Sequence, residues 1–285
     1  MGFGDDLLVT SHAAKIKKQY PNKQIVIGNF KKKEAYPSII YNNNPNITDC
    51  SKINPGIEVH IIDYHPENRP YIDYEKSTSN KYIWNKRFKA DPGELFFSEE
   101  EIVNAKKTIQ SAKNYWFKFN SNKNFEAIIF IETSSTKKNH KNWSTKHLNK
   151  GWGENNWLKL INLLKKKYLL IMSTHDYSVN SQDIYKANNM DFRHACGIMS
   201  LCDLYVGPEG GFSHVAGALK KNAVVYYGGW IPPDIIGYDF HVNLYYEHEN
   251  SPCGLYRDIC EHCSDARKAI TVENYYKEIR SILSN

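Results

Sequence analysis

Apolar and polar positions form two different patterns along the second half of the chain. Short runs of β-branched and aromatic residues predict buried strands, and apolar residues repeated every three or four positions predict helices between them. The predicted strands are 127–131, 168–172, 204–206 and 223–227, and the predicted helices are 154–166, 194–201, one that begins near Ser213, and 271–283. Such repeated units predict a parallel sheet with right-handed crossovers, whose ligands bind beyond the carboxyl ends of the strands.

The first half of the chain shows fewer regular patterns. Helical spacing near the N-terminus stops at Pro21, and strands are predicted at 24–28 and 58–64. Ser98 and Glu101 have the spacing of a capping box, which predicts that a helix begins there. Together with the second half, this pattern predicts the α/β fold class.

The length of 285 residues is enough for two domains with separate cores. We place the boundary in the polar segment 120–124. Residues 1–122 then form the N-terminal domain and residues 123–270 form the C-terminal domain.

One turn carries the strongest chemical signal. Residues 205–219 read YVGPEGGFSHVAGAL, which is a strand end, an acidic Glu-Gly-Gly turn and a helix. A helix N-terminus after a glycine turn favours a phosphate, because its unpaired N–H groups and its dipole both attract negative charge. Gly210 and Gly211 allow close approach of a ligand to the backbone, Ser213 is a candidate N-cap, and His214 falls in the first helical turn. The alternative interpretation is an ordinary strand-to-helix turn without a ligand.

The segment around this turn resembles a known signature. Residues 201–229, LCDLYVGPEGGFSHVAGALKKNAVVYYGG, are similar to the donor site of glycosyltransferase family nine, the bacterial ADP-heptose–lipopolysaccharide heptosyltransferases. The positions that match the family pattern are Glu209, Gly211, His214, Ala216, Ala218 and Leu219. Two positions depart from it, since Glu209 replaces the usual Asp and Gly210 replaces the usual Ser or Thr. The resemblance implies a GT-B fold, in which two Rossmann-like domains face a cleft. Residues 1–122 would then be the acceptor-side domain and residues 123–270 the donor-side domain, and a closing helix, here within 271–285, would return to the N-terminal domain.

Two further segments carry the resemblance. Gly4-Asp5 resembles the family's N-terminal Gly-Asp element, although only residues 1–3 precede it where family members have a strand. The resemblance assigns the role of general base to Asp5, for which helix capping is the local alternative. Residues 150–157 resemble the family's Lys-x-Trp-x-x-x-x-Trp element, and Lys150 matches the lysine that meets the donor phosphates. In the hydroxyl run before it, the matching donor contacts are Ser134 and Ser135.

The activity implied by the resemblance is inverting glycosyl transfer that needs no divalent cation. A heptose or another hexose-like sugar would pass from a nucleotide-diphosphate donor to a cell-surface glycan or lipid-linked acceptor, as in lipopolysaccharide or capsule synthesis. Lys150 and the amides of residues 210–212, which include Phe212, would stabilise the departing diphosphate, with Ser213 and His214 assisting. Glu209 would hold sugar hydroxyls.

The polar loop after the strand 58–64 is a further candidate. His65, Arg69 and Tyr71 follow a predicted strand end, where functional loops of α/β proteins lie. They are candidates for contact with the acceptor or with the donor phosphates.

Two other functions stay open. A non-catalytic nucleotide-sugar-binding protein is favoured by the departures at Glu209 and Gly210 and by the short segment before Asp5. A GT-B-like nucleotide-sugar epimerase would use the same donor and no acceptor.

The charge and hydropathy of the chain bear on its partners. A formal net charge of +6 suits anionic substrates or the anionic inner leaflet of a membrane, although solvated helix faces explain the lysine clusters equally well. Since no apolar run approaches membrane-spanning length and no signal-peptide pattern opens the chain, we expect a cytoplasmic protein, with peripheral contact to the inner membrane as an option. We expect no nucleic-acid partner, because no basic and aromatic recognition pattern is present.

The cysteines suggest a metal site rather than disulfides. Six cysteines without a signal peptide argue against a disulfide framework. Cys260 and Cys263 have a common chelate spacing, and with Cys253 they form a candidate structural metal site. The candidates for its fourth ligand are His248, His262 and Cys202.

Overall fold

The computed structural model describes residues 2–120, 123–134, 148–173, 184–187, 191–249, 251–255 and 257–284. Its elements in chain order are α1 (Phe3–Gln19), β1 (Gln24–Asn29), β2 (Glu34–Ala35), the 3₁₀ turns η1 (Ile39–Tyr41) and η2 (Cys50–Lys52), β3 (Val59–Asp63), α2 (Glu99–Phe119), β4 (Ile128–Ile131), α4 (Glu154–Leu164), β5 (Leu169–Ser173), β6 (Tyr185–Ala187), α5 (Phe192–Ser200), β7 (Leu204–Pro208), α6 (Gly211–Ala218), β8 (Ala223–Tyr227), α7 (Pro233–Ile236), β9 (Val242–Tyr245), α8 (Glu261–Ala269) and α9 (Val272–Leu283).

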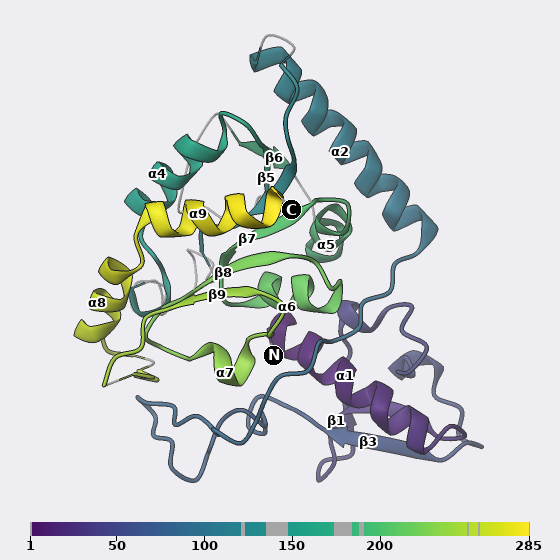
Figure 1. The fold of residues 1–285 in the computed structure, drawn as a ribbon. Coiled ribbons are helices and arrows are strands. Elements are labelled where there is room, and N and C mark those ends of the chain that lie inside the picture. Colours follow the sequence, from purple (N-terminus) through teal and green to yellow (C-terminus); the bar gives the residue numbers. More distant parts are fainter. Residues whose placement is uncertain are drawn as a thin grey trace.

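The larger sheet lies in the C-terminal half and is parallel throughout. Its strand order is β6-β5-β4-β7-β8-β9. Every residue of β4, β5, β7 and β8 is buried, which explains their continuous apolar runs, because helices cover both faces of the sheet. Alternate strand residues face two cores, one shared with α2, α5 and α6 and the other with α4 and α9. The predicted α/β class with a parallel sheet is confirmed (Figure 1).

The N-terminal sheet is much smaller. Within the described residues it has the order β2-β1-β3, in which β1 pairs with β3 in parallel and with the two-residue β2 antiparallel. Strand β1 is buried along its whole length, whereas β3 is mostly half-buried. The N-terminal part is therefore a reduced version of the Rossmann-like domain that the resemblance implied.

Two helices pack differently from the expected division of the chain. Helix α2, placed before the boundary in the N-terminal domain, packs against α5, β5 and β6 of the larger sheet. Helix α9 was expected to return to the N-terminal domain, and this was wrong: it packs against α4 and β8. Its apolar stripe, Val272, Tyr275 and Ile279, is buried in the same core as Trp152 and Trp157.

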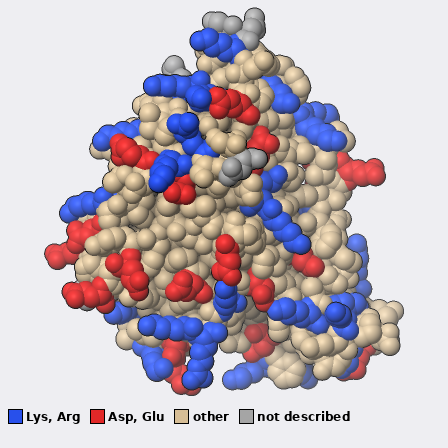
Figure 2. Space-filling model, viewed as in Figure 1, with Lys and Arg blue, Asp and Glu red and all other residues tan. Residues whose placement is uncertain are grey.

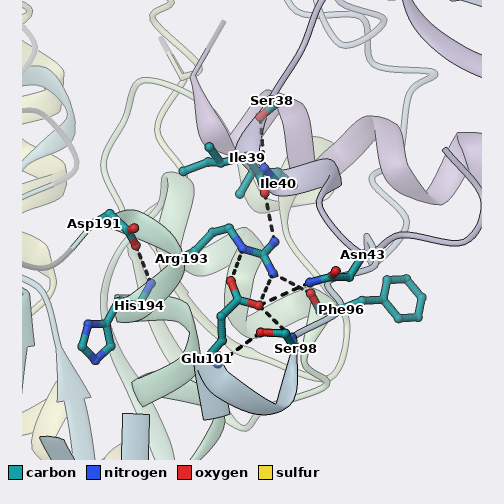
Figure 3. Close-up of polar contacts among 10 residues, drawn as sticks. All are labelled: Ser38, Ile39, Ile40, Asn43, Phe96, Ser98, Glu101, Asp191, Arg193 and His194. Atoms are coloured by element: carbon teal, nitrogen blue, oxygen red, sulfur yellow. Dashed lines mark hydrogen bonds and ion pairs between the residues drawn. The ribbon is translucent and has the colours of Figure 1, made fainter. Parts of the chain in front are cut away.

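A buried arginine joins the two halves of the chain. The Arg193 guanidinium on α5 donates to both carboxylate oxygens of Glu101, at 2.5 and 2.8 Å, and to the carbonyls of Ile39 and Phe96 at 2.9 and 2.6 Å (Figure 3). Glu101 also accepts from the Ser98 amide in the predicted capping box, and the arginine lowers the pKa of the glutamate. Since an unpaired buried charge is costly, this cluster fixes η1 and the start of α2 against α5.

The segment 64–98, all of it described, forms neither helix nor strand, and it docks on the C-terminal half instead. The Trp84 indole donates to the Trp230 carbonyl at 2.9 Å, and the Ala90 amide donates to the Ile235 carbonyl at 2.9 Å. These long-range bonds take the place of a regular ladder.

The molecular surface carries charges of both signs. On the face shown in Figure 2, Lys and Arg side chains are interspersed with Asp and Glu, around a broad uncharged area. In the part of the chain that the structure describes, no helix is both long enough and apolar enough to cross a membrane.

Candidate donor-binding and catalytic site

The signature turn follows β7 and starts α6 two residues earlier than expected. Gly210 is the N-cap with a φ of 148°, a conformation that side chains disfavour, and the helix begins at Gly211. Ser213 is therefore not the N-cap: at position N3 its hydroxyl accepts from the Gly210 amide at 3.1 Å and donates to the Gly210 carbonyl at 2.8 Å. Ser213 thus fixes the backbone of the turn by bonding to both polar groups of Gly210.

The N-terminal helix meets this turn directly. A Cβ added at Gly4 would lie 3.0 Å from His214 Cδ2 and 3.3 Å from Gly211 Cα, so a side chain here would press α1 away from α6. Helices α1 and α6 pack together over this contact (Figure 1). The structure therefore brings the Gly4-Asp5 element and the signature turn together, as the resemblance implied, although they are about two hundred positions apart in the sequence.

Asp5 is held by two side chains from the docked segment. It is not the N-cap of α1, which is Gly2; it occupies position N3, where its Oδ2 accepts from the Gly2 amide at 3.3 Å. Its Oδ1 accepts from the Tyr71 hydroxyl at 2.5 Å, and Arg69 Nε lies 3.4 Å from Oδ2. Burial, followed by the charge of Asp5, raises the pKa of Tyr71 well above its ordinary value, so that the phenol stays a donor. Of the three predicted loop residues, Arg69 and Tyr71 therefore lie at Asp5, whereas His65 Nε2 lies 3.6 Å from Asp63 Oδ1.

Lys150 lies at the signature turn and pairs with its acidic residue. Its ammonium is 2.7 Å from Glu209 Oε1 and 4.4 Å from the ring centroid of Trp230. The two charged side chains are 14% and 4% exposed. The resemblance assigned Lys150 to phosphates and Glu209 to sugar hydroxyls, and the structure places both side chains at one point of the site.

His214 is a buried, neutral base beside the contact between Gly4 and Gly211. Its Nδ1 is 2.8 Å from the Tyr238 hydroxyl, and burial lowers the pKa of the imidazole to about 4, with opposing and reinforcing contributions from Asp5 and Lys150. A neutral ring offers one N–H donor without carrying a charge.

The other predicted donor residues have mixed positions. The Phe212 ring packs against Phe130 and Phe192, which in turn stacks on Phe3, so this side chain belongs to the wall between α1, α5 and α6. Ser134 follows β4 on the same sheet edge as the turn, whereas Ser135 lies outside the described residues.

The predicted cysteine cluster comes together around His262. The ligand atoms of Cys253, Cys260, His262 and Cys263 lie within 4.8 Å of one another, and all three thiols are buried. Cys253 Sγ is 3.3 Å from Cys263 Sγ, and the His248 ring stacks on the His262 ring. The third candidate for the fourth ligand, Cys202, packs in the core beside α5. Three thiolates and an imidazole in one place fit tetrahedral zinc or iron.

Comparisons with known proteins now bear on this geometry. No family model and no curated protein match the sequence. Among solved structures, a glycosyl transferase family 9 protein from Veillonella parvula has a TM-score of 0.60 at 12% identity, over 99% of this chain and 95% of that one. TibC, an iron-containing dodecameric glycosyltransferase from enterotoxigenic E. coli, has a TM-score of 0.60 at 13% identity, over 99% and 74%. The chain has the fold of these glycosyltransferases.

A further similar structure is longer than this chain. The E. coli ADP-heptose lps heptosyltransferase II has a TM-score of 0.45 at 15% identity, and the match covers 76% of this chain and 58% of that protein. The fold resemblance to the Veillonella parvula protein and to TibC extends over nearly the whole chain.

Three residues at the site were missed by sequence reasoning. Tyr238 binds His214, Trp230 lies under Lys150, and Asn149 anchors the backbone before Lys150. Trp230 could have been suspected, because it directly follows the Gly-Gly end of a predicted strand. Tyr238 and Asn149 stand in segments without a periodic pattern, and only the tertiary structure identifies them.

Proposed function

We propose that this chain is an inverting glycosyltransferase of the family nine type. It transfers a heptose or another hexose-like sugar from a nucleotide-diphosphate donor to a hydroxyl of a glycan or lipid-linked acceptor. The observation that carries the proposal is the contact of Gly4 with Gly211 and His214, because it sets a carboxylate next to a helix N-terminus suited to a diphosphate. The shared fold supports the same conclusion.

The reaction needs a proton acceptor and a stabilised leaving group. The acceptor oxygen forms a bond to the anomeric carbon while the bond from that carbon to the diphosphate oxygen breaks. Asp5 takes the proton of the attacking hydroxyl, and Tyr71 and Arg69 orient its carboxylate. Among the described residues, Oδ1 accepts from Tyr71 alone and keeps a second lone pair, which leaves room for a hydroxyl. A general base typically contributes about 10²- to 10⁴-fold to the rate.

The departing diphosphate takes up the negative charge. Lys150 and the amides of Gly211 and Phe212 at the start of α6 supply positive potential there, and the α6 dipole adds to it; the Gly210 amide instead donates to the Ser213 hydroxyl. In the structure Lys150 is paired with Glu209, so a bound diphosphate shares the ammonium with this carboxylate. His214 adds a neutral donor, which does not compete with Lys150 for the phosphate charge.

A donor panel tests the function. The chain is incubated with ADP-heptose and other nucleotide-diphosphate sugars, with and without glycan or lipid-linked acceptors, and both free nucleoside diphosphate and glycosylated product are measured. We expect one donor to be consumed with inversion at the anomeric carbon when the right acceptor is present. Donor binding without turnover would favour a binding protein, and donor isomerisation without an acceptor would favour an epimerase.

Calorimetry on variants tests the anion site separately. We expect Lys150→Ala to weaken nucleoside diphosphate binding, because it removes the one ammonium placed against the signature turn among the described residues. Lys106→Ala, on the exposed side of α2, is the matched control and should bind normally. Equal affinities in both variants would show that the diphosphate binds elsewhere.

We also propose that Cys253, Cys260, His262 and Cys263 hold a zinc or iron ion. The donor set supports it, and TibC is an iron-containing protein of the same fold. The ion would cross-link the segment around α8, which is a structural contribution. Elemental analysis of the purified protein should find about one metal per chain. Cys263→Ala should lose the metal and Cys202→Ala should keep it, and metal retained in Cys263→Ala would contradict the assignment.

A further inference from the structure

The backbone around Lys150 is anchored by the cysteine-bearing segment, which we define as residues 251–255 and 257–267. The neighbouring Asn149 is 1% exposed. Its Nδ2 donates to the Leu255 carbonyl at 3.2 Å and to the Asp258 carbonyl at 2.8 Å, and its Oδ1 accepts from the Cys260 amide at 2.9 Å. One buried amide thus ties the residue before Lys150 to three points of this segment.

The same segment also donates hydrogen bonds to the backbone on both sides of Asn149 and Lys150. The Arg267 guanidinium on α8 donates from Nε to the Gly151 carbonyl at 3.1 Å and from Nη2 to the Leu148 carbonyl. On its other side this stretch rests on the end of β8, where a Cβ at Gly228 would lie 2.7 Å from the Asn149 carbonyl oxygen. The segment 148–151 is therefore enclosed between the sheet edge and the cysteine-bearing segment.

The side chain of Lys150 depends on this segment as well. The Trp230 ring that faces its ammonium donates an indole N–H to the Leu255 carbonyl at 2.9 Å, and the Trp230 carbonyl accepts from the Gly254 amide at 3.2 Å. Leu255 thus accepts from both Asn149 and Trp230. Asn149 orients the backbone of Lys150 and Trp230 faces its side chain. Both residues are held by hydrogen bonds to the peptides of Gly254 and Leu255, which follow Cys253.

We propose that Asn149 and Trp230 are positioning residues, which hold the Lys150 ammonium where a nucleoside diphosphate binds and make that binding depend on the cysteine-bearing segment. The inference rests on the proposed function, since it requires Lys150 to contact the diphosphate. Because such coupling is reciprocal, a bound diphosphate also stabilises the cysteine-bearing segment.

The chain contains a matched control for Asn149. Gln24 is also a buried amide, and it makes the same pattern of bonds: Nε2 donates to the Asn54 and Ile57 carbonyls at 2.9 Å each, and Oε1 accepts from the Asn54 amide at 2.7 Å. It lies at the start of β1, remote from the carboxyl ends of the strands. A loss of these three bonds should therefore affect stability alone.

The first experiment measures the affinity for ADP and for pyrophosphate, a probe without a base, by calorimetry. We expect Asn149→Ala to bind both about tenfold more weakly, within the usual range of coupling between sites, and Gln24→Ala to bind them normally. Trp230→Phe keeps an aromatic face and should lose less affinity than Trp230→Leu, which also keeps the test open if Asn149→Ala does not fold. Equal affinities in wild type, Asn149→Ala and Trp230→Leu would overturn the inference.

A double-mutant cycle separates this inference from the proposed function. In a Lys150→Ala background, Asn149→Ala should change the affinity less than about twofold, because the group it positions is gone. If Lys150→Ala alone has no effect, the anion site of the proposed function is wrong. If Lys150→Ala weakens binding and the Asn149→Ala effect persists at full size in the double variant, Asn149 does not act through Lys150 and the inference fails.

Hydrogen exchange supplies a readout that a purely structural role would not move. ADP should slow exchange of the amides in the cysteine-bearing segment of the wild type and of Gln24→Ala, and it should do so much less in Asn149→Ala at saturating ADP. Equal protection of this segment in all three proteins would contradict the coupling.

Discussion

The two halves of this molecule position their site residues in different ways. In the C-terminal half, the signature turn connects β7, which is buried along its whole length, to the regular helix α6. In the N-terminal half, Arg69 and Tyr71 come from the segment 64–98, which has neither helix nor strand and is held by docking. The donor side therefore rests on local structure, and the proposed base rests on long-range contacts.

This difference separates the consequences of mutation. A change in the docked segment should disturb Asp5 while leaving the turn at Glu209 in place. A change in the turn should weaken donor binding while leaving the fold intact. Four experiments test this division, from the largest expected effect to the smallest.

The largest effect is expected from Asp5→Asn. The amide keeps the size and an acceptor oxygen but cannot take a proton, so kcat for transfer should fall by about 10²- to 10⁴-fold. Calorimetry with the donor diphosphate should show unchanged affinity. The control is Asp6→Asn, since Asp6 accepts from the Ser38 hydroxyl at 2.7 Å and burial raises its pKa. Near-normal turnover in Asp5→Asn would point to Asp6, Asp63 or Glu209 as the base.

The next effect concerns the docked segment. A Cβ at Gly93 would overlap the Leu7 carbonyl and lie 2.8 Å from Thr10 Oγ1, a hydroxyl to which the Glu94 amide donates. Gly93→Ala should lower the free energy of unfolding by about 1–3 kcal/mol, as overpacking typically does. Transfer should fall with the donor affinity unchanged. Denaturant unfolding and calorimetry check this, and a parallel loss of donor affinity would show that the two halves are not separable.

The third experiment uses pH. Burial lowers the pKa values of His214 and His241 to about 4, so between pH 6.5 and 4 the unfolded state binds more protons than the folded state. Stability is therefore complete above pH 6.5 and is lost as the pH falls towards 4. From pH 7 to pH 5 each histidine should cost on the order of 2 kcal/mol. Urea unfolding at several pH values measures this effect. The free energy of unfolding of His241→Phe should fall less from pH 7 to pH 5 than that of the wild type, and an equal fall in both proteins would contradict the assignment.

The smallest effect is expected at the turn itself. A Cβ at Gly211 would meet the Phe192 ring at an ordinary contact distance of 3.6 Å, so the first side-chain carbon fits there without a clash. Gly211→Val should keep the fold but place bulk where a phosphate approaches, and we expect about tenfold weaker diphosphate binding, or about 1.4 kcal/mol. Circular dichroism and calorimetry on the same samples check both parts. If Gly211→Val lost secondary structure but kept its diphosphate affinity, the turn would serve the fold and not binding, which is the opposite of what the comparison with Gly93→Ala predicts.

The sequence by itself determined the parts that depend on local patterns. Strands with both faces buried read as continuous apolar runs, and β4, β5, β7 and β8 were predicted for that reason. The Glu-Gly-Gly turn and the chelate spacing of Cys260 and Cys263 are also local features. The elements β2, β6, β9 and α7 were not predicted, because two to four residues are too few to carry a period, and α8 was not predicted because only Cys263 and Ala266 of its nine residues are buried.

Tertiary structure alone decided the partners. The stripe of Val272, Tyr275 and Ile279 predicted that α9 packs on something, but it suits any apolar groove, and the helix lies on α4 and not on the N-terminal domain. The contacts of Asp5 with Tyr71 and of Asn149 with Leu255 join residues that share no period or spacing. A periodic pattern shows which face of an element is buried, whereas the identity of the neighbour depends on how all the elements pack together.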